Sequence, residues 1–380
     1  MIDLTSDKKE KKVEYVELIY DLIFVYIIGR NNTLLHHTQN GFVEVGLFMA
    51  YVMCTLAVIQ IWTFTAYYIN LYGRNGARDH IFMFVNMFLL YFIGEATRKD
   101  WQDYHTMYHI AWVLILLNIA LQYAIEIKNH KGEPLHLKRI KGMITVLLGE
   151  SLLVAAAIFE HNKFGTSYFS LAAILFGIIF VSVSASGKKT AQSLVDFPHL
   201  SERIMLYVVF TFGEMIIAIA GYFEGAFNLN SLYFCLMAFL IVVGLFLSYG
   251  TLYDRIIDRE KQTSGIGYIL IHIFIIFSLN NITAALEFMR DDKINLVPKI
   301  LFLAGSVIIY YAFLLSTRSY AKQKCAINIK FYIKMLLIAA SFVALMLLLK
   351  ENMKLNIAVT VLYVYAVYVI IYNAARNLES

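Results

Sequence analysis

The chain has 380 residues, of which 60% are hydrophobic and only 16% are charged, and its formal net charge is +5 at pH 7. A soluble domain carries about 25% charged residues and needs far more polar surface to cover its core, so this composition excludes a soluble globular protein. The small positive charge lies in short loops, where it indicates membrane orientation and not nucleic-acid binding.

Apolar stretches of about 18 or more residues recur along the whole chain and predict an all-α fold, a polytopic transmembrane helical bundle of about twelve spans. The predicted spans cover approximately residues 15–35, 42–68, 80–96, 107–127, 140–159, 168–186, 203–223, 229–252, 265–288, 297–316, 329–349 and 355–373. No long linker interrupts them. We therefore expect an N-terminal tail (1–14), a single transmembrane domain (15–373) and a C-terminal tail (374–380).

Lysine and arginine are distributed unevenly between the two sides of this bundle. The side that holds the N-terminus carries 22 of the 32, the opposite side carries nine, and Lys334 falls inside a span. Positively charged loops stay in the cytoplasm, so both tails are expected there and the protein is expected in the cytoplasmic membrane. The lipid bilayer is its expected partner.

Two segments 64 residues apart are similar. RIKGMITVLLGE runs from Arg139 to Glu150, and RIMLYVVFTFGE runs from Arg203 to Glu214. The match predicts a tandem repeat of helical hairpins. Eleven residues make close to three helical turns and a rise of about 16 Å, so each Glu is expected near the membrane midplane above an Arg on the same face. We expect the glycine before each Glu to admit a closely packed neighbouring helix.

Ionisable residues inside spans are costly and are candidates for function by default. Glu17 and Asp21 lie one turn apart on one face of the first span. With Glu150, Glu214 and His272 they form our candidate intramembrane polar site. Because all five lie in odd-numbered spans, we expect these spans to line a shared polar interior, with Asp21 and Glu214 in one cavity and the even spans outside. Alternatively, each acid serves only to pack helices.

A second polar group is expected near the cytoplasmic ends of the fifth and seventh spans, where it could hold an anionic lipid headgroup. Its members are Arg139, His199, Glu202 and Arg203. The sequence indicates no cofactor and no metal site. His105 and His109 have a spacing that suits a metal, but no carboxylate motif accompanies them.

Several motifs resemble the bacterial low temperature requirement protein A family. They are ELIYDLIFV from Glu17 to Val25, Ile61-Trp62 with the following YGRNGARD run, HLSER from His199 to Arg203 with Gly213-Glu214 downstream, and Ile271-His272. The resemblance extends from Glu17 to about Glu287. Met215 stands where the family pattern has Ser after Gly-Glu, whereas Ser151 keeps that hydroxyl in the fifth span. The resemblance implies a multi-pass membrane protein with a link to growth at low temperature.

Three functions fit these observations. The midplane carboxylates favour an integral membrane protein of the low temperature requirement type that transports a small solute coupled to protons or another cation. The first alternative is a membrane-embedded enzyme or binding protein that acts on lipid or isoprenoid headgroups, although the sequence shows no hydrolase, kinase or metalloprotease motif. The second alternative is a non-catalytic envelope protein that supports growth in the cold.

Overall fold

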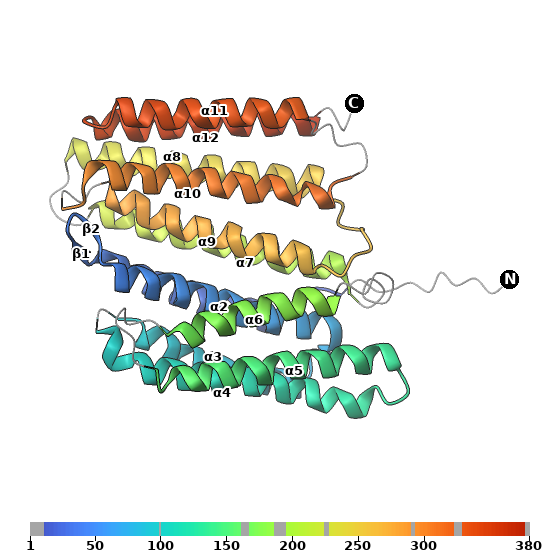
Figure 1. The fold of residues 1–380 in the computed structure, drawn as a ribbon. Coiled ribbons are helices and arrows are strands. Elements are labelled where there is room, and N and C mark those ends of the chain that lie inside the picture. Colours follow the sequence, from blue (N-terminus) through green and yellow to red (C-terminus); the bar gives the residue numbers. More distant parts are fainter. Residues whose placement is uncertain are drawn as a thin grey trace.

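The computed structural model describes residues 11–98, 100–160, 167–185, 195–223, 228–289, 293–322 and 329–376. Within these ranges the chain forms twelve α-helices that lie side by side in one bundle (Figure 1). They are α1 (Tyr15–Asn32), α2 (Val45–Tyr72), α3 (Ala77–Ala96), α4 (Trp101–Asn129), α5 (Pro134–Ala157), α6 (Tyr168–Ala185), α7 (Phe197–Ile219), α8 (Leu229–Thr251), α9 (Ile266–Phe288), α10 (Leu296–Ser316), α11 (Ile329–Leu348) and α12 (Met353–Arg376). The predicted all-α fold is confirmed.

Short elements connect some of these helices. Between α1 and α2 the chain forms the turn η1 (Thr33–His36) and a hairpin of β1 (Thr38–Gln39) and β2 (Phe42–Val43), in which Thr38 pairs with Val43. Three further short helical turns are η2 (Ala220–Phe223), η3 (Leu252–Ile256) and η4 (Thr317–Tyr320). Most of the two predicted tails lies outside the described residues.

Nine of the described helices are long and apolar enough to cross a membrane. The other three are α1 and α7, which carry charged side chains, and α6, whose described apolar stretch is shorter. Large apolar side chains point outward around the bundle, among them Leu152, Leu336 and Leu362, each at least 70% exposed. Such a surface requires a hydrocarbon environment, so the chain is a multi-pass membrane protein.

The expectation that odd-numbered helices lie inside and even-numbered helices outside is wrong. The two most enclosed helices are α2 and α9, while α3 and α5 are much less buried. Figure 1 shows α2 near the middle of the bundle, α3 to α5 at one edge, and α11 and α12 at the other. Helix α2 carries buried polar side chains along its length, including Gln60, Thr65 and Asn70, so the polar interior is shared between odd and even helices.

The helices that carry the similar segments start in the same way. Helix α5 begins at Pro134, and α7 has Pro198 in its first turn, where a missing N–H costs nothing. Asp196 caps α7 by accepting a hydrogen bond from the backbone nitrogen of His199 at 3.1 Å. In both helices an arginine follows the proline by five residues, so the similarity extends to the helix start.

The pattern of helix contacts repeats after six helices, whereas a tandem hairpin repeat would repeat after two. Helix α1 packs against α2 and α3, and α3 packs against α4. Six helices later, α7 packs against α8 and α9, and α9 packs against α10. Helices α1 and α7 also contact each other directly, so the equivalent helices of the two halves meet at the centre of the bundle.

Candidate functional site

The contact between α1 and α7 contains a group of ionisable residues that we call the inner charge cluster: Glu17, Asp21, His199 and Arg203. The guanidinium of Arg203 lies 2.9 Å from Glu17 Oε2 and 3.1 Å from Asp21 Oδ1. His199 Nε2 lies 3.6 Å from Glu17 Oε1. All four side chains are buried. Glu17 and Asp21 share one helical face, as predicted, and Arg203 bridges them across the helix interface.

Helix α2 positions this cluster from a third side. Trp62 donates its indole N–H to Asp21 Oδ1 at 2.8 Å, and its ring lies 5.8 Å from the Arg203 guanidinium. The amide of Asn70 contacts His199 Nδ1 at 3.1 Å and donates to the carbonyl of Asp196 at 2.7 Å. These roles of Trp62 and Asn70 were not predicted from the sequence. The run of polar residues along α2 was the available signal.

The inner charge cluster adjoins a pocket of about 560 Å³, which Glu17 helps to line. Lys11 reaches into this pocket and donates to the carbonyls of Ile69 and Gly73, the latter at 2.9 Å, where α2 ends. A helix C-terminus attracts cations. Burial lowers the pKa of the Lys11 ammonium, while the carboxylate of Glu17 acts in the opposite direction. The pocket therefore already accommodates an ammonium group close to the cluster.

Charge in the cluster is not balanced by Arg203 alone. Two carboxylates, Glu17 and Asp21, face one guanidinium, and Asp21 Oδ2 has no hydrogen-bond partner among the described residues. Buried carboxylates are costly unless they are paired or protonated. The second positive charge near the two carboxylates is the Lys11 ammonium in the pocket, so a proton or a cation that entered the pocket would compete with Lys11.

Glu214 does not share a cavity with Asp21, contrary to expectation. Its half-buried carboxylate lies against Gly29 of α1, where an added Cβ would meet Oε1 at 2.5 Å. Gly29 lies eight residues beyond Asp21, a rise of about 12 Å. Glu287 of α9 interacts with Glu214 electrostatically, and Glu287 Oε2 itself lies 2.8 Å from His36 Nε2. The two acids are thus an outer site that is separate from the inner charge cluster.

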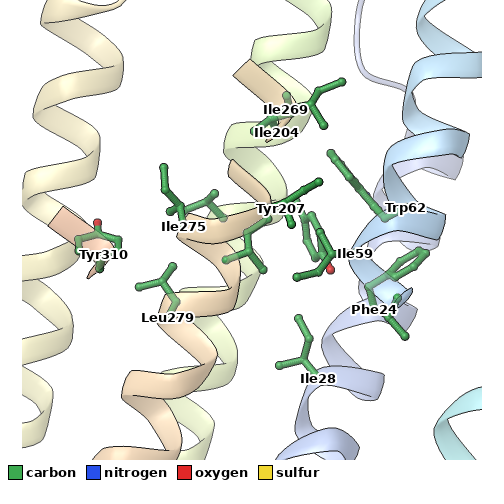
Figure 2. Packing of buried hydrophobic residues seen from close by; sticks show 14 of the residues in the cluster. Phe24, Ile28, Ile59, Trp62, Ile204, Tyr207, Ile269, Ile275, Leu279 and Tyr310 are labelled. Atoms are coloured by element: carbon green, nitrogen blue, oxygen red, sulfur yellow. The ribbon is translucent and has the colours of Figure 1, made fainter. Parts of the chain in front are cut away.

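Aromatic side chains fill the space between the two sites, and we call them the aromatic layer: Phe24, Trp62 and Tyr207. The ring centroid of Tyr207 lies 4.6 Å from that of Trp62 and 6.0 Å from that of Phe24. Figure 2 shows Tyr207 of α7 between α9 and the side chains of Trp62 and Phe24. Along α7, Tyr207 falls between Arg203 and Glu214. Packed rings therefore divide the α1–α7 interface into an inner and an outer part.

Glu150 lies apart from both sites, at the contact of α5 with α6. Its side chain is fully buried, and its carboxylate oxygens have no hydrogen-bond partner among the described residues. A Cβ added at Gly177 of α6 would meet Glu150 Oε2 at 2.5 Å and would also collide with the amide of Gln60. An ionised carboxylate without a partner is very costly in such a place, so this environment favours the neutral acid.

The glycines before the two repeat glutamates differ from each other. A Cβ added at Gly149 would meet the ring of Phe176 at 2.7 Å, so a neighbouring helix does approach closely there. At Gly213 the described residues place no atom within 4 Å of an added Cβ. The expectation of close approach is right for Gly149 and wrong for Gly213.

Gly177, which lies against Glu150, and Gly213, which has open space beside it, give a matched pair of substitutions. Gly177→Ala is expected to destabilise the protein by about 1 kcal/mol, because the methyl group displaces the buried ends of Gln60 and Glu150 by more than alanine gains in helix propensity. Gly213→Ala should be neutral or stabilising by up to about 1 kcal/mol, because alanine favours the helix and meets open space. Unfolding midpoints of the two variants in one detergent measure the contrast. Equal midpoints would contradict the packing described for Glu150.

His272 has local partners. Its Nδ1 donates to the carbonyl of Tyr268 at 2.8 Å, and its Nε2 lies 3.2 Å from the hydroxyl of Tyr249. Because the carbonyl can only accept, Nδ1 carries the proton and Nε2 accepts from Tyr249. The bond with Tyr249 joins α9 to α8, and the two bonds together account for both ring nitrogens without a ligand.

The residues expected to hold a lipid headgroup are not brought together. Arg203 and His199 belong to the inner charge cluster and are buried, whereas Glu202 points to the exterior. Arg139 is half-buried and donates to the hydroxyl of Tyr67 on α2. Arg203 does not face the headgroups because the two carboxylates of α1 take up its charge inside the bundle.

A second buried ion pair was missed by sequence reasoning. Arg78 at the start of α3 lies 2.7 Å from Glu126 Oε1 near the end of α4, and Glu126 is fully buried. Asp79 lies 3.2 Å from the same guanidinium and accepts from the backbone nitrogen of Arg74 at 2.7 Å. The charged run from 74 to 79 thus fixes the α2–α3 turn and ties α3 to α4.

Comparison with known proteins gives one family. The profile described as bacterial low temperature requirement A protein (LtrA) matches residues 12–368, which is nearly the whole chain. No curated protein matches. The matched range includes the inner charge cluster, the aromatic layer and the outer site, which lie between Glu17 and Glu287.

Proposed function

The chain belongs to the bacterial low temperature requirement A (LtrA) family, and from that premise we propose that it transports a small solute coupled to the movement of protons or another cation. The observation that carries this proposal is the bridging of Glu17 and Asp21 by the buried Arg203. Inside a membrane protein, ionisable side chains mark ion pathways and proton relays. Here two acids compete for one fixed cation.

A charge-exchange cycle follows from this arrangement. In the structure Arg203 neutralises one of the two negative charges of Glu17 and Asp21. A proton or cation that arrives through the pocket takes the place of the Lys11 ammonium as the second positive charge and weakens the hold of the carboxylates on Arg203. The helices α1 and α7 are then less firmly joined at this end. Binding of the cation is thereby coupled to the packing of two central helices.

The two sites in series support a gated pathway. The outer pair, Glu214 and Glu287, lies beyond the aromatic layer, so a cation released from the inner charge cluster has a second acidic site ahead of it. A transporter exposes its site to one side at a time. In this proposal Tyr207 and its aromatic neighbours close the path between the sites, and movement of α7 against α1 opens it.

Of the two alternatives, headgroup chemistry has less support. It needs the positive charge of Arg203 at the membrane surface, and that charge is buried and paired. A purely structural role, in which the ion pairs only hold the helices together, makes the opposite prediction for ion movement. It is therefore an outcome of the test described next.

The test records charge movement in purified protein reconstituted into vesicles on a solid-supported membrane. A rapid step to acidic pH, or to sodium, should produce a transient current absent from protein-free vesicles, because the ion enters a site inside the membrane. Pools of amino acids, sugars, polyamines and nucleosides are then added to find the solute that sustains the current. If folded protein gives no current with either ion and no pool, the transport proposal is wrong and a structural role is favoured.

A further inference from the structure

We propose that the turn between α4 and α5 binds one divalent transition-metal ion of the Zn²⁺ class through His130, Glu133 and His136. Each residue offers one ligand atom, and the three atoms all lie within 4.8 Å of one another. Two imidazoles and a carboxylate are a donor set that suits zinc and its neighbours. This site is separate from the inner charge cluster and does not depend on the proposed transport.

The turn itself brings the ligands together. Gly132 has a φ of +97°, which glycine adopts without strain, and the chain reverses there between the two helices. His130 directly follows α4, and His136 lies in the first turn of α5. Their rings stack with centroids 4.8 Å apart and planes 22° apart. His136 Nε2 lies 3.6 Å from Glu133 Oε2.

Hydrogen bonds around the site prepare His130 for a metal. Its Nδ1 lies 3.0 Å from the carbonyl of Glu126. Because a carbonyl only accepts, Nδ1 carries the proton, and the lone pair of the neutral ring is on Nε2. Metal-binding histidines are commonly oriented in this way by a carbonyl or carboxylate. The Glu126 carboxylate also lies 3.5 Å from this Nδ1 and is held by Arg78 at 2.7 Å, so part of the support for His130 is anchored in α3.

His136 has an unused nitrogen. Its Nδ1 is buried and has no hydrogen-bond partner among the described residues, which calls for a ligand or solvent at that atom. Tyr72 at the end of α2 packs against both rings, at 5.1 Å from His130 and 5.8 Å from His136. The rings are thus backed by the bundle on one side, while Glu133 lies on the exposed side, from which an ion can arrive.

The geometry requires side-chain movement. Zinc binds nitrogen and oxygen at about 2.0–2.2 Å in a tetrahedral arrangement, which separates its ligand atoms by about 3.4 Å. The ligand atoms now lie within 4.8 Å of one another and the two rings are nearly parallel, so side-chain rotations must close this spacing and point both ring lone pairs at one ion. Three protein ligands leave the fourth position for water. Calcium and magnesium prefer oxygen ligands, so two imidazoles disfavour them.

The test measures bound metal in the intact protein, purified through an affinity tag that contains no histidine. The protein is stripped with a chelator, dialysed against Zn²⁺ and analysed by mass spectrometry for zinc. We expect one ion per chain in the wild type, and at least a tenfold loss of affinity in His130→Gln and in His136→Gln. His80→Gln is the matched control at the same end of the bundle, and it should bind as the wild type does. Co²⁺ should give the visible absorption of a tetrahedral site in the wild type and in this control, and should not give it in the two site variants.

A second readout guards against misfolding. Zinc should raise the unfolding temperature of the wild type and of His80→Gln, because it binds the folded state, and should leave His136→Gln unchanged. If a histidine variant does not fold, Glu133→Gln replaces it, since Glu133 is exposed and its carboxylate is a ligand only in this proposal. Wild-type protein without bound zinc, or site variants that retain it as the control does, would overturn the assignment.

Discussion

Replacing Arg203 with Met is expected to lower the free energy of unfolding by about 3–5 kcal/mol, the cost typical of removing one partner of a buried ion pair. Met occupies a similar length but has no charge, so Glu17 and Asp21 remain buried side by side without a cation between them. Thermal and denaturant unfolding in a single detergent measure the loss. Glu202→Gln, one residue away and exposed, should change stability by less than about 0.5 kcal/mol.

Two further variants separate the ion pair from simple packing. In the double variant Asp21→Asn/Arg203→Met one unpaired carboxylate is gone, so it should be more stable than Arg203→Met alone. Arg203→Lys keeps the charge but loses the planar fork that reaches both carboxylates, and should lie between wild type and Met. If the effects of Asp21→Asn and Arg203→Met simply add, the two residues are not coupled as the distances indicate.

Arg78→Met should destabilise the protein by about 3 kcal/mol, whereas Glu126→Gln should cost about 1 kcal/mol. The asymmetry arises from burial. The Glu126 carboxylate is fully enclosed, but the Arg78 side chain is 32% exposed and also contacts Asp79. Without Arg78, the neighbours of the carboxylate among the described residues are the Asn129 amide at 3.0 Å, the Tyr68 hydroxyl at 3.4 Å and His130 Nδ1 at 3.5 Å.

Without Glu126, by contrast, the guanidinium of Arg78 still has Asp79 and solvent. Unfolding midpoints of the two single variants, with Arg74→Met as an exposed control in the same turn, give the comparison. Equal losses for Arg78→Met and Glu126→Gln would show that the two side chains are equally well solvated. That result would contradict the asymmetry in burial.

The membrane fold could be predicted from sequence because it depends on a local property, the length of apolar stretches. The helices fall close to the predicted spans, and Glu17 and Asp21 share a face as helical spacing requires. The partner of these acids could not be predicted in the same way. Arg203 is 182 residues from Asp21 along the chain, and a single sequence does not show which helices pack together. The position of Arg203 near the start of a helix favoured contact with lipid headgroups at the membrane surface, which the structure does not support.

One other error has a related cause. We expected a shared cavity for Asp21 and Glu214 because both lie in odd-numbered helices. Helix parity says nothing about depth in the membrane, and the rise along α1 separates the two sites.

The proposed metal site departs from the prediction of no metal site, which weighed the His105 and His109 spacing within one helix. His130 and His136 approach each other only because the turn at Gly132 folds α5 back on α4.

The central claim is that Asp21 and its neighbours take up a proton or cation from the pocket. The most direct test is the transient current after a pH or sodium step, recorded for Asp21→Asn beside Glu202→Gln, with both proteins shown to be folded by their unfolding temperatures. Asn keeps the shape of Asp and can still accept from Trp62, but it cannot ionise. We predict that the current falls to the level of protein-free vesicles in Asp21→Asn and stays at the wild-type level in Glu202→Gln. A wild-type current in folded Asp21→Asn would contradict the claim.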